Sequence, residues 1–363
     1  MQRQRSSCPG RRPSSDRSDA PSRSASAPAR LSSAVIAGVV VGIVGLFIVG
    51  ERLSRPRTVG PPGADTLPAR PGRPEAGAEA ATATAAIVPV RPDERELAVD
   101  ADALAESLAR DFAGNGRALA VSGRVLQLFV APERGRARFE QATAIAADEP
   151  EAWLGLAETA WHGGDYPQAA AAMARLERVA PRLAIEKAFL WVDSLVKAGD
   201  GVAALEILGR IADTAGGEAA LPGWAQVLLG QARTQAGDLA GAVTAYDRAA
   251  ADPAQRVVAA YGLAPAWARL GDPERARRAR ETYAALQQEN LAAFDSAQQA
   301  ETTTRLDAKY PVLAGYHCEA GSLYARAGRF DEAAAHWRRA AALAPEWPEP
   351  RRFLEVLAAQ EGR

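Results

Sequence analysis

The sequence predicts an all-α protein: an α-solenoid of helix-turn-helix repeats, preceded by a single transmembrane helix and a disordered linker. Alanine dominates the composition and clusters of β-branched residues are nearly absent beyond residue 50, which favours helices over strands. A glycine followed by a polar residue also recurs at intervals that suit the turn of a helical hairpin. These turn pairs are Gly164-Asp165, Gly199-Asp200, Gly237-Asp238, Gly271-Asp272 and Gly328-Arg329.

The clearest repeat unit runs from Pro150 to Pro181 and sets the register for the rest of the chain. With Pro150 as position 1, small residues stand at positions 8 and 20, where they let two antiparallel helices touch, and large apolar residues fill the groove between neighbouring units. The motif residues are Trp153, Leu156, Ala157, Tyr166, Ala169, Leu176 and Pro181. This stretch resembles a tetratricopeptide repeat, a helical hairpin of about 34 residues.

The resemblance implies several repeats, because one such hairpin cannot bury its own apolar face. An amphipathic helix opens a repeat domain at 93–363 and covers the open edge of the first repeat. The fifth repeat contains Pro265, which predicts a kink or an early helix start. Its second helix then overshoots the family length, and about 23 residues separate it from the last repeat. The repeats are placed at 116–149, 150–183, 185–218, 223–256, 257–290 and 314–347, followed by a capping helix at 348–360.

A transmembrane helix is predicted at 32–50, in an uncharged segment rich in valine, isoleucine and glycine. About 19 residues at about 1.5 Å each give about 28 Å, close to the hydrocarbon thickness of about 30 Å. Residues 1–31 are rich in arginine and serine, which predicts a disordered tail that stays in the cytoplasm. The repeats then lie outside the cytoplasm, in a bacterial periplasm. A cleaved signal peptide is the alternative, but no small-x-small cleavage site follows the apolar run.

Residues 51–92 form a linker rich in proline, alanine, glycine and arginine. Such a composition favours an extended chain, in part polyproline helix. About 40 residues reach roughly 35 Å as a flexible coil, and prolines lengthen that reach. The linker therefore tethers the repeat domain to the membrane while leaving it free to move.

The sequence does not predict an enzyme. It contains no glycine-rich phosphate loop, nucleophile elbow or pair of acidic residues at a defined spacing. His162, His317 and His336 stand without partners at metal-ligand spacing, and Cys8 and Cys318 do not form a disulfide framework. We therefore expect neither a cofactor nor a metal site.

Charge distribution argues against nucleic-acid binding by the repeats. Residues 1–60 hold ten arginines and three acidic residues, a net charge of +7, which leaves −8 for the remainder of a chain with a total of −1. A nucleic-acid-binding surface needs clustered positive charge instead.

The resemblance to tetratricopeptide repeats implies a binding groove lined by the first helix of each repeat. Its groove positions in the second and third repeats are acidic with aromatic insertions, which suits an extended peptide that carries basic and apolar residues. We expect the carboxylates of Glu158 and Asp193 to be exposed, so that reversing their charge changes stability little. The groove residues are Glu151, Leu154, Glu158, Trp161, His162, Glu186, Phe189, Leu190, Asp193 and Lys197.

These observations predict a membrane-tethered interaction scaffold that binds a protein or peptide in its groove. Two alternatives stay open. One is a self-associating structural envelope protein, a homodimer formed through Gly38 and Gly42 of the membrane span or through the long helix near 275–305. The other is a non-catalytic subunit of an envelope enzyme or assembly complex.

Overall fold

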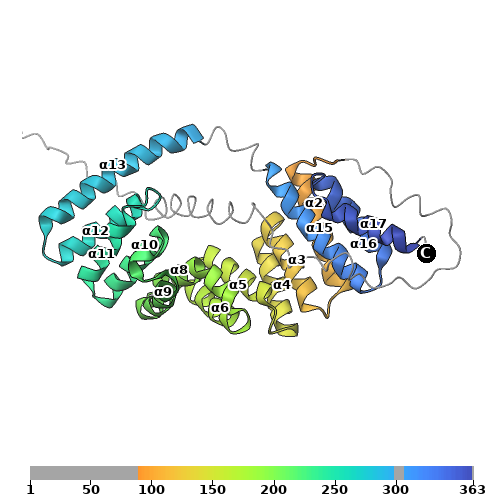
Figure 1. Cartoon of the computed structure of the whole chain (residues 1–363), viewed down its shortest axis with the longest axis horizontal. Coiled ribbons are helices and arrows are strands. Elements are labelled where there is room, and N and C mark those ends of the chain that lie inside the picture. Colours follow the sequence, from red (N-terminus) through yellow and green to blue (C-terminus); the bar gives the residue numbers. More distant parts are fainter. Residues whose placement is uncertain (1–88, 298–305, 362–363) are drawn as a thin grey trace, which may run out of the picture. The chain divides into compact units, whose positions relative to one another are not determined.

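The computed structural model describes residues 89–297 and 306–361, which form helices joined by turns, without a β-strand (Figure 1). The all-helical fold predicted from the sequence is confirmed for these residues. The helices are α2 (Glu94–Asp111), α3 (Gly116–Phe129), α4 (Pro132–Ile145), α5 (Pro150–His162), α6 (Tyr166–Val179), α7 (Pro181–Glu186), α8 (Ala188–Lys197), α9 (Gly201–Ala215), η3 (Glu218–Ala220), α10 (Gly223–Ala236), α11 (Leu239–Ala249), α12 (Arg256–Arg269), α13 (Pro273–Ala297), α15 (Lys309–Arg326), α16 (Phe330–Leu343) and α17 (Glu349–Glu361).

The helices pack as consecutive hairpins. The first helix of a hairpin also contacts the hairpin before it. The pairs are α3 with α4, α5 with α6, α8 with α9, α10 with α11, α12 with α13, and α15 with α16. Helix α5 also contacts both α3 and α4, and α8, α10 and α12 repeat this contact with the hairpins before them. The stacking buries the apolar faces that an isolated hairpin would expose, so the described helices form a solenoid.

The recurrent glycine-aspartate pairs end one helix and start the next. Gly164 and Gly237 have φ angles of 78° and 86°, a left-handed conformation that favours glycine because it has no Cβ. The aspartate that follows each of them is an N-cap: Asp165 accepts a hydrogen bond from the backbone N–H of Gln168, and Asp238 accepts one from Gly241. Each turn is therefore specified by two adjacent residues.

A large side chain on a second helix packs against glycines on two successive first helices. Phe139 of α4 is fully buried and meets Gly123 of α3 and Gly155 of α5. A Cβ placed on Gly123 would lie 2.8 Å from Phe139 Cδ1, a distance that real Cβ atoms do not show. The glycines thus let one ring lie between two repeats. The same arrangement recurs for Tyr246 of α11, with Gly230 of α10 and Gly262 of α12.

Two details of the repeat pattern concern the fifth and third repeats. Pro265, where the sequence predicts a kink or an early helix start, lies inside α12. Pro265 and Tyr261 are both exposed, so water can satisfy the Tyr261 carbonyl that a proline in the helix leaves without a donor. In the third repeat, the helix that would begin at residue 185 is divided at Lys187 into α7 and α8.

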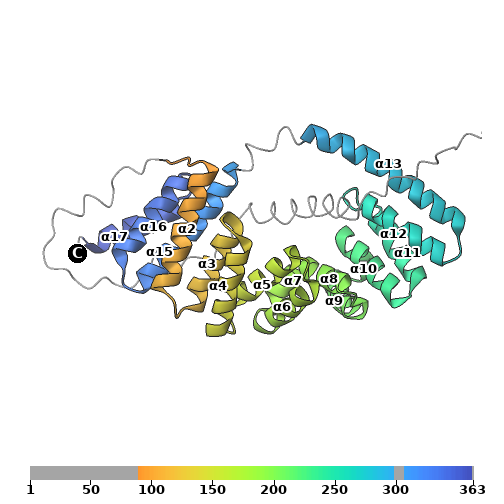
Figure 2. The same cartoon turned by 180° about the vertical axis from the view of Figure 1, so that it is seen from behind.

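The last repeat packs against the start of the domain. Helix α15 contacts α2 and α3, and both views place it beside α2 (Figures 1 and 2). The backbone N–H of Val90 donates to the carbonyl of Ala342 at 3.0 Å, and the Tyr310 hydroxyl donates to the carbonyl of Pro92 at 2.8 Å. Helix α2 therefore packs on the last repeat as well as on the first. The shared core includes Leu97, Leu104, Leu108, Val125, Leu313, Tyr324, Trp337 and Phe353.

A buried histidine, His317, and a half-buried one, His336, lie at this junction. His317 Nδ1 of α15 lies 3.1 Å from His336 Nδ1 of α16, and the ring of Tyr324 stacks on His336. His317 Nε2 is 3.4 Å from a carboxylate oxygen of Asp100 on α2, which also accepts a hydrogen bond from Arg339. Burial, and then the neighbouring His317, lowers the pKa of His336 to about 4. Both histidines thus contribute to the packing of α15 and α16, which are far from α2 in the sequence.

No helix within the described ranges is both long and apolar enough to cross a membrane. The predicted transmembrane helix at 32–50, the tail at 1–31 and the linker up to residue 88 lie outside the described residues. Their assignment stays a prediction from the sequence.

The contact between Phe139 and its glycines predicts that Gly155→Ala lowers the free energy of unfolding by about 1–3 kcal/mol, because an added methyl group overpacks a filled interface. Urea unfolding followed by circular dichroism measures this change. Gly209→Ala is the matched control, because nothing lies within 4 Å of a Cβ added at that helical glycine. It should raise stability by about 0.5–1 kcal/mol. Equal stability of Gly155→Ala and the natural protein would contradict the contact.

The histidine pair predicts a loss of stability in acid. The pKa of His336 is about 4 when folded and about 6.5 when unfolded. Between these values the unfolded chain binds a proton that the folded chain does not, so this contribution is complete above about pH 6.5 and is lost as the pH falls towards 4. The contribution is on the order of 3 kcal/mol.

The measurement compares urea unfolding of the natural protein and His336→Phe at several pH values. Phenylalanine keeps an aromatic ring on Tyr324 but does not titrate. The stability difference between the two proteins should therefore change in favour of the variant as the pH falls. His162→Gln, at an exposed histidine, should follow the natural protein. A pH-independent difference for His336→Phe would show that His336 is not responsible.

Candidate partner-binding groove

The predicted groove residues lie on adjacent first helices. Helix α5 carries Glu151, Leu154, Glu158, Trp161 and His162; α7 ends with Glu186; and α8 carries Phe189, Leu190, Asp193 and Lys197. Helices α5 and α8 contact each other, so the repeat stacking brings these positions together. Their accessibility differs: Leu154, Glu158, Trp161, Leu190 and Asp193 are buried, Glu151 and Phe189 are half-buried, and His162, Glu186 and Lys197 are exposed.

Glu158 is part of a buried ion pair. Its side chain pairs with the Arg124 guanidinium of α3, and the two side chains are only 7% and 6% exposed. The other terminal nitrogen of Arg124 lies 3.3 Å from Glu151 Oε2. The expectation of an exposed Glu158 is therefore wrong, because an arginine of the preceding repeat reaches across and neutralises it.

Asp193 is likewise buried, with 6% of its surface exposed. Its Oδ2 accepts a hydrogen bond of 2.5 Å from Trp161 Nε1 and lies 2.8 Å from Lys197 Nζ. Lys197 Nζ also lies 4.8 Å from the ring centre of Trp161 and 5.1 Å from that of Tyr166. The expected exposure of Asp193 is wrong for the same physical reason: neighbouring groups inside the groove already satisfy the carboxylate.

A third group of charges joins the last repeat to the first. Arg117 of α3 pairs with Glu319 of α15 at 2.6 Å and with Glu149 at 3.2 Å. Burial raises the pKa of Glu319, and the attraction of Arg117 offsets only part of this rise. Ion pairs therefore run across the first helices of several repeats.

Sequence reasoning named Lys197 but missed two other basic members of these pairs, Arg117 and Arg124. Both arginines occupy groove positions of the first repeat, 116–149, whereas the predicted groove residues come from the second and third repeats. Applying the same positions to that repeat would have found them. The sequence marks Tyr166 as a residue of the repeat motif, and only the fold brings it to Lys197.

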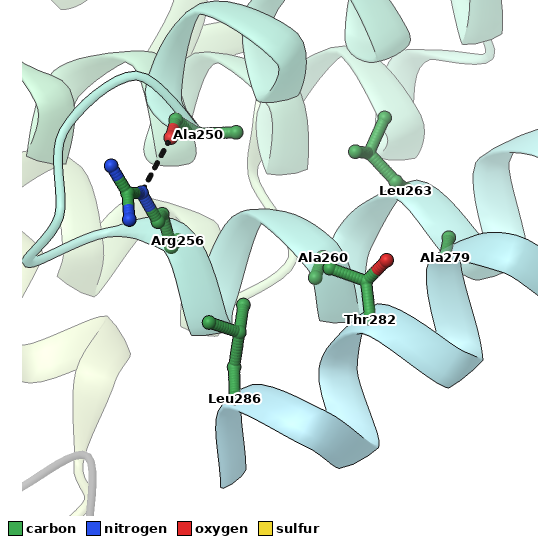
Figure 3. A pocket seen from close by; sticks show the side chains of 7 residues that line it. All are labelled: Ala250, Arg256, Ala260, Leu263, Ala279, Thr282 and Leu286. Atoms are coloured by element: carbon green, nitrogen blue, oxygen red, sulfur yellow. Dashed lines mark hydrogen bonds between the residues drawn. The ribbon is translucent and has the colours of Figure 1, made fainter. Parts of the chain in front are cut away.

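A separate pocket of about 270 Å³ lies in the fifth repeat (Figure 3). Arg256 donates a hydrogen bond of 3.3 Å to the Ala250 carbonyl at one side of it. The lining comes from the end of α11 and from α12 and α13, and not from the predicted groove residues. It consists of Ala250, Arg256, Ala260, Leu263, Ala279, Thr282 and Leu286.

The groove offers charges and aromatic rings rather than a set of metal ligands. Among the residues that the structure describes, no group of three or more histidine, cysteine, aspartate or glutamate side chains is placed to hold a metal ion.

Comparisons with known proteins identify the repeat type. Residues 314–347 match the tetratricopeptide repeat family. The chain contains a tetratricopeptide repeat. No curated protein matches the chain significantly.

The chain is similar in architecture to solved helical-repeat structures. One is YrrB, described as a tetratricopeptide repeat protein with an unusual peptide-binding site: 16% identity, 55% of this chain and 99% of that one covered, TM-score 0.43. Another is MamA from Desulfovibrio magneticus: 17% identity, 55% and 98% covered, TM-score 0.38. A tetratricopeptide repeat protein from Parabacteroides merdae shows 12% identity, 72% and 98% covered, and a TM-score of 0.40.

The buried ion pair predicts that Glu158→Lys strongly destabilises the repeat array. It would place a second positive charge beside buried Arg124, and breaking a buried pair costs about 3–5 kcal/mol. Glu186→Lys, at an exposed position one repeat later, should stay within about 0.5 kcal/mol of the natural protein. Thermal unfolding followed by circular dichroism measures both. A melting temperature for Glu158→Lys equal to that of Glu186→Lys would show that the pair contributes nothing.

Proposed function

We propose that this protein is a membrane-tethered interaction scaffold that binds an extended segment of a partner protein along α5, α7 and α8. The observation that carries the proposal is the surface at the junction of the second and third repeats. Glu186 is exposed there, and Glu151 and the aromatic ring of Phe189 are half-buried, beside the buried carboxylates of Glu158 and Asp193. Accessible acidic groups attract a basic segment, and a half-buried aromatic ring offers it an apolar anchor.

The aromatic anchor is fixed by packing rather than by the partner. The ring of Phe189 meets the ring of Trp224 edge-to-face, with 5.6 Å between their centres. Such a contact restrains both side chains before binding, which reduces the entropy that binding must overcome. The preferred partner is therefore a peptide with basic and apolar residues. Tetratricopeptide repeats are helical hairpins whose stacking creates such extended surfaces, which supports the assignment.

The proposal includes the membrane tether that the sequence predicts. Residues 32–50 would span the membrane, with 1–31 in the cytoplasm and the repeats in the periplasm. A linker at 51–92 would let the groove reach partners roughly 35 Å from the membrane surface. The support for this part is the sequence alone.

The test places a photo-crosslinking amino acid at Glu186 of the full-length protein in cells. The matched control carries it at Val202, which is 74% exposed on α9, the second helix of the same repeat. We expect one dominant protein to be captured from residue 186 and not from 202, and Glu151→Lys to weaken this capture. The compartment of the captured protein then tests the topology.

Other outcomes decide between the alternatives. Capture of a second copy of this chain would favour the self-associating structural protein. The same set of proteins captured from both positions would contradict a partner groove at α5 to α8. Release of the protein from membranes when residues 32–50 are deleted would support the tether, and unchanged membrane association would contradict it.

A further inference from the structure

The Lys197 ammonium lies in a three-sided site at the end of the groove. We propose that the faces of Trp161 and Tyr166 and the carboxylate of Asp193 form a cation-binding site, which Lys197 fills in the free protein and an arginine side chain of the partner occupies in the complex. This inference rests on the proposed function and specifies the partner's chemistry.

The site is built from three helices. Trp161 belongs to the last turn of α5, Tyr166 is the first residue of α6, and Asp193 and Lys197 lie one turn apart on α8. The ammonium nitrogen is 4.8 Å and 5.1 Å from the two ring centres and 2.8 Å from Asp193 Oδ2. Ring faces and a carboxylate all carry negative potential, so the site selects a cation.

Two walls of the site are fixed independently of the lysine. Trp161 is 5% exposed and Asp193 6% exposed, and the indole N–H donates directly to the carboxylate. By contrast, 34% of the Lys197 side chain is exposed, and Lys197 is the last residue of α8. The lysine can therefore leave into water while Trp161 and Asp193 stay in place.

An arginine is the cation that can replace this lysine. The exchange puts one positive charge in place of another, so the buried carboxylate of Asp193 is never left unpaired. An ammonium is strongly hydrated and gains water on leaving, whereas a guanidinium is weakly hydrated, planar and able to stack on an aromatic face while it pairs with a carboxylate. The exchange thus favours arginine over lysine in the partner.

If Lys197 competes with the partner, two substitutions at this exposed residue should have opposite effects. Lys197→Met keeps the stem but removes the competing charge, so it should lower the dissociation constant for an arginine ligand roughly two- to five-fold. Lys197→Arg supplies a better internal competitor and should raise it by a similar factor.

The probe is N-acetyl-arginine amide, titrated into the purified full-length protein in detergent. The signal is the NMR resonance of the Trp161 indole N–H, assigned by its loss in Trp161→Phe. We expect saturable shifts with affinities in the order Lys197→Met, natural protein, Lys197→Arg. N-acetyl-glutamine amide should cause no shift, and Lys309→Met, which removes a lysine paired with Glu94 on α2, should match the natural protein.

Each result has a consequence for the cation site. No shift in Lys197→Met, or equal affinity in Lys197→Met and Lys197→Arg, would overturn the inference. Adding Tyr166→Leu to Lys197→Met should weaken binding, and unchanged binding would remove Tyr166 from the site.

The same variants separate this inference from the proposed function. Equal capture of a partner from residue 186 in Lys197→Met, Lys197→Arg and the natural protein would support the partner groove and contradict the cation site. If the affinities for the arginine probe follow the predicted order but position 186 captures no specific protein, the cation site is supported and the scaffold proposal is contradicted.

Discussion

The structure depends on one packing contact, in which a large side chain from a second helix is held against small residues of two consecutive first helices. Phe139 occupies this place between Gly123 and Gly155, and Tyr246 occupies it in the fourth repeat. The contact sets how closely neighbouring hairpins approach, because any Cβ on the glycines would meet the ring. Since each ring belongs to two repeats at once, the hairpins cannot be treated as independent units, and their stability is shared between neighbours.

The position of the last repeat follows from the same need to cover apolar faces. Helix α2 has a buried stripe that includes Leu97, Leu104 and Leu108, and α15 and α16 cover it with Leu313, Tyr324 and Trp337. Burial on this scale is worth far more than the loop closure it requires, which grows only slowly with loop length. Asp100 of α2 also lies 3.4 Å from His317 Nε2 and accepts a hydrogen bond from Arg339, and Asp111 of α2 accepts one from the Tyr324 hydroxyl. The repeat that is last in the sequence therefore completes the core at the beginning of the domain.

The groove shows why residue type alone is a poor guide to a binding surface. Glu158 and Asp193 stand at groove positions, but both carboxylates are buried and paired, with Arg124 and with Trp161 and Lys197. A buried carboxylate holds the helices in register, whereas Glu186 lies on the exposed surface. Lys197 differs from the buried residues of this network, because it is paired with Asp193 but exposed. For this reason it is the member of the network that a partner can replace.

The sequence by itself determined the helices, the turns and the repeat type. Local rules suffice for these: glycine adopts the left-handed turn conformation, aspartate caps the next helix, and small residues at positions 8 and 20 mark the hairpin. For residues 314–347, the match to the tetratricopeptide repeat family supports the repeat type. Only the tertiary structure decided which repeats are neighbours and which charges are exposed. Arg124 and Glu158 are 34 residues apart, one repeat length, but Arg117 and Glu319 are 202 residues apart, and no local pattern states that these two meet. Their pairing depends on how the hairpins stack to bury apolar surface, and this stacking depends on contacts along the whole chain.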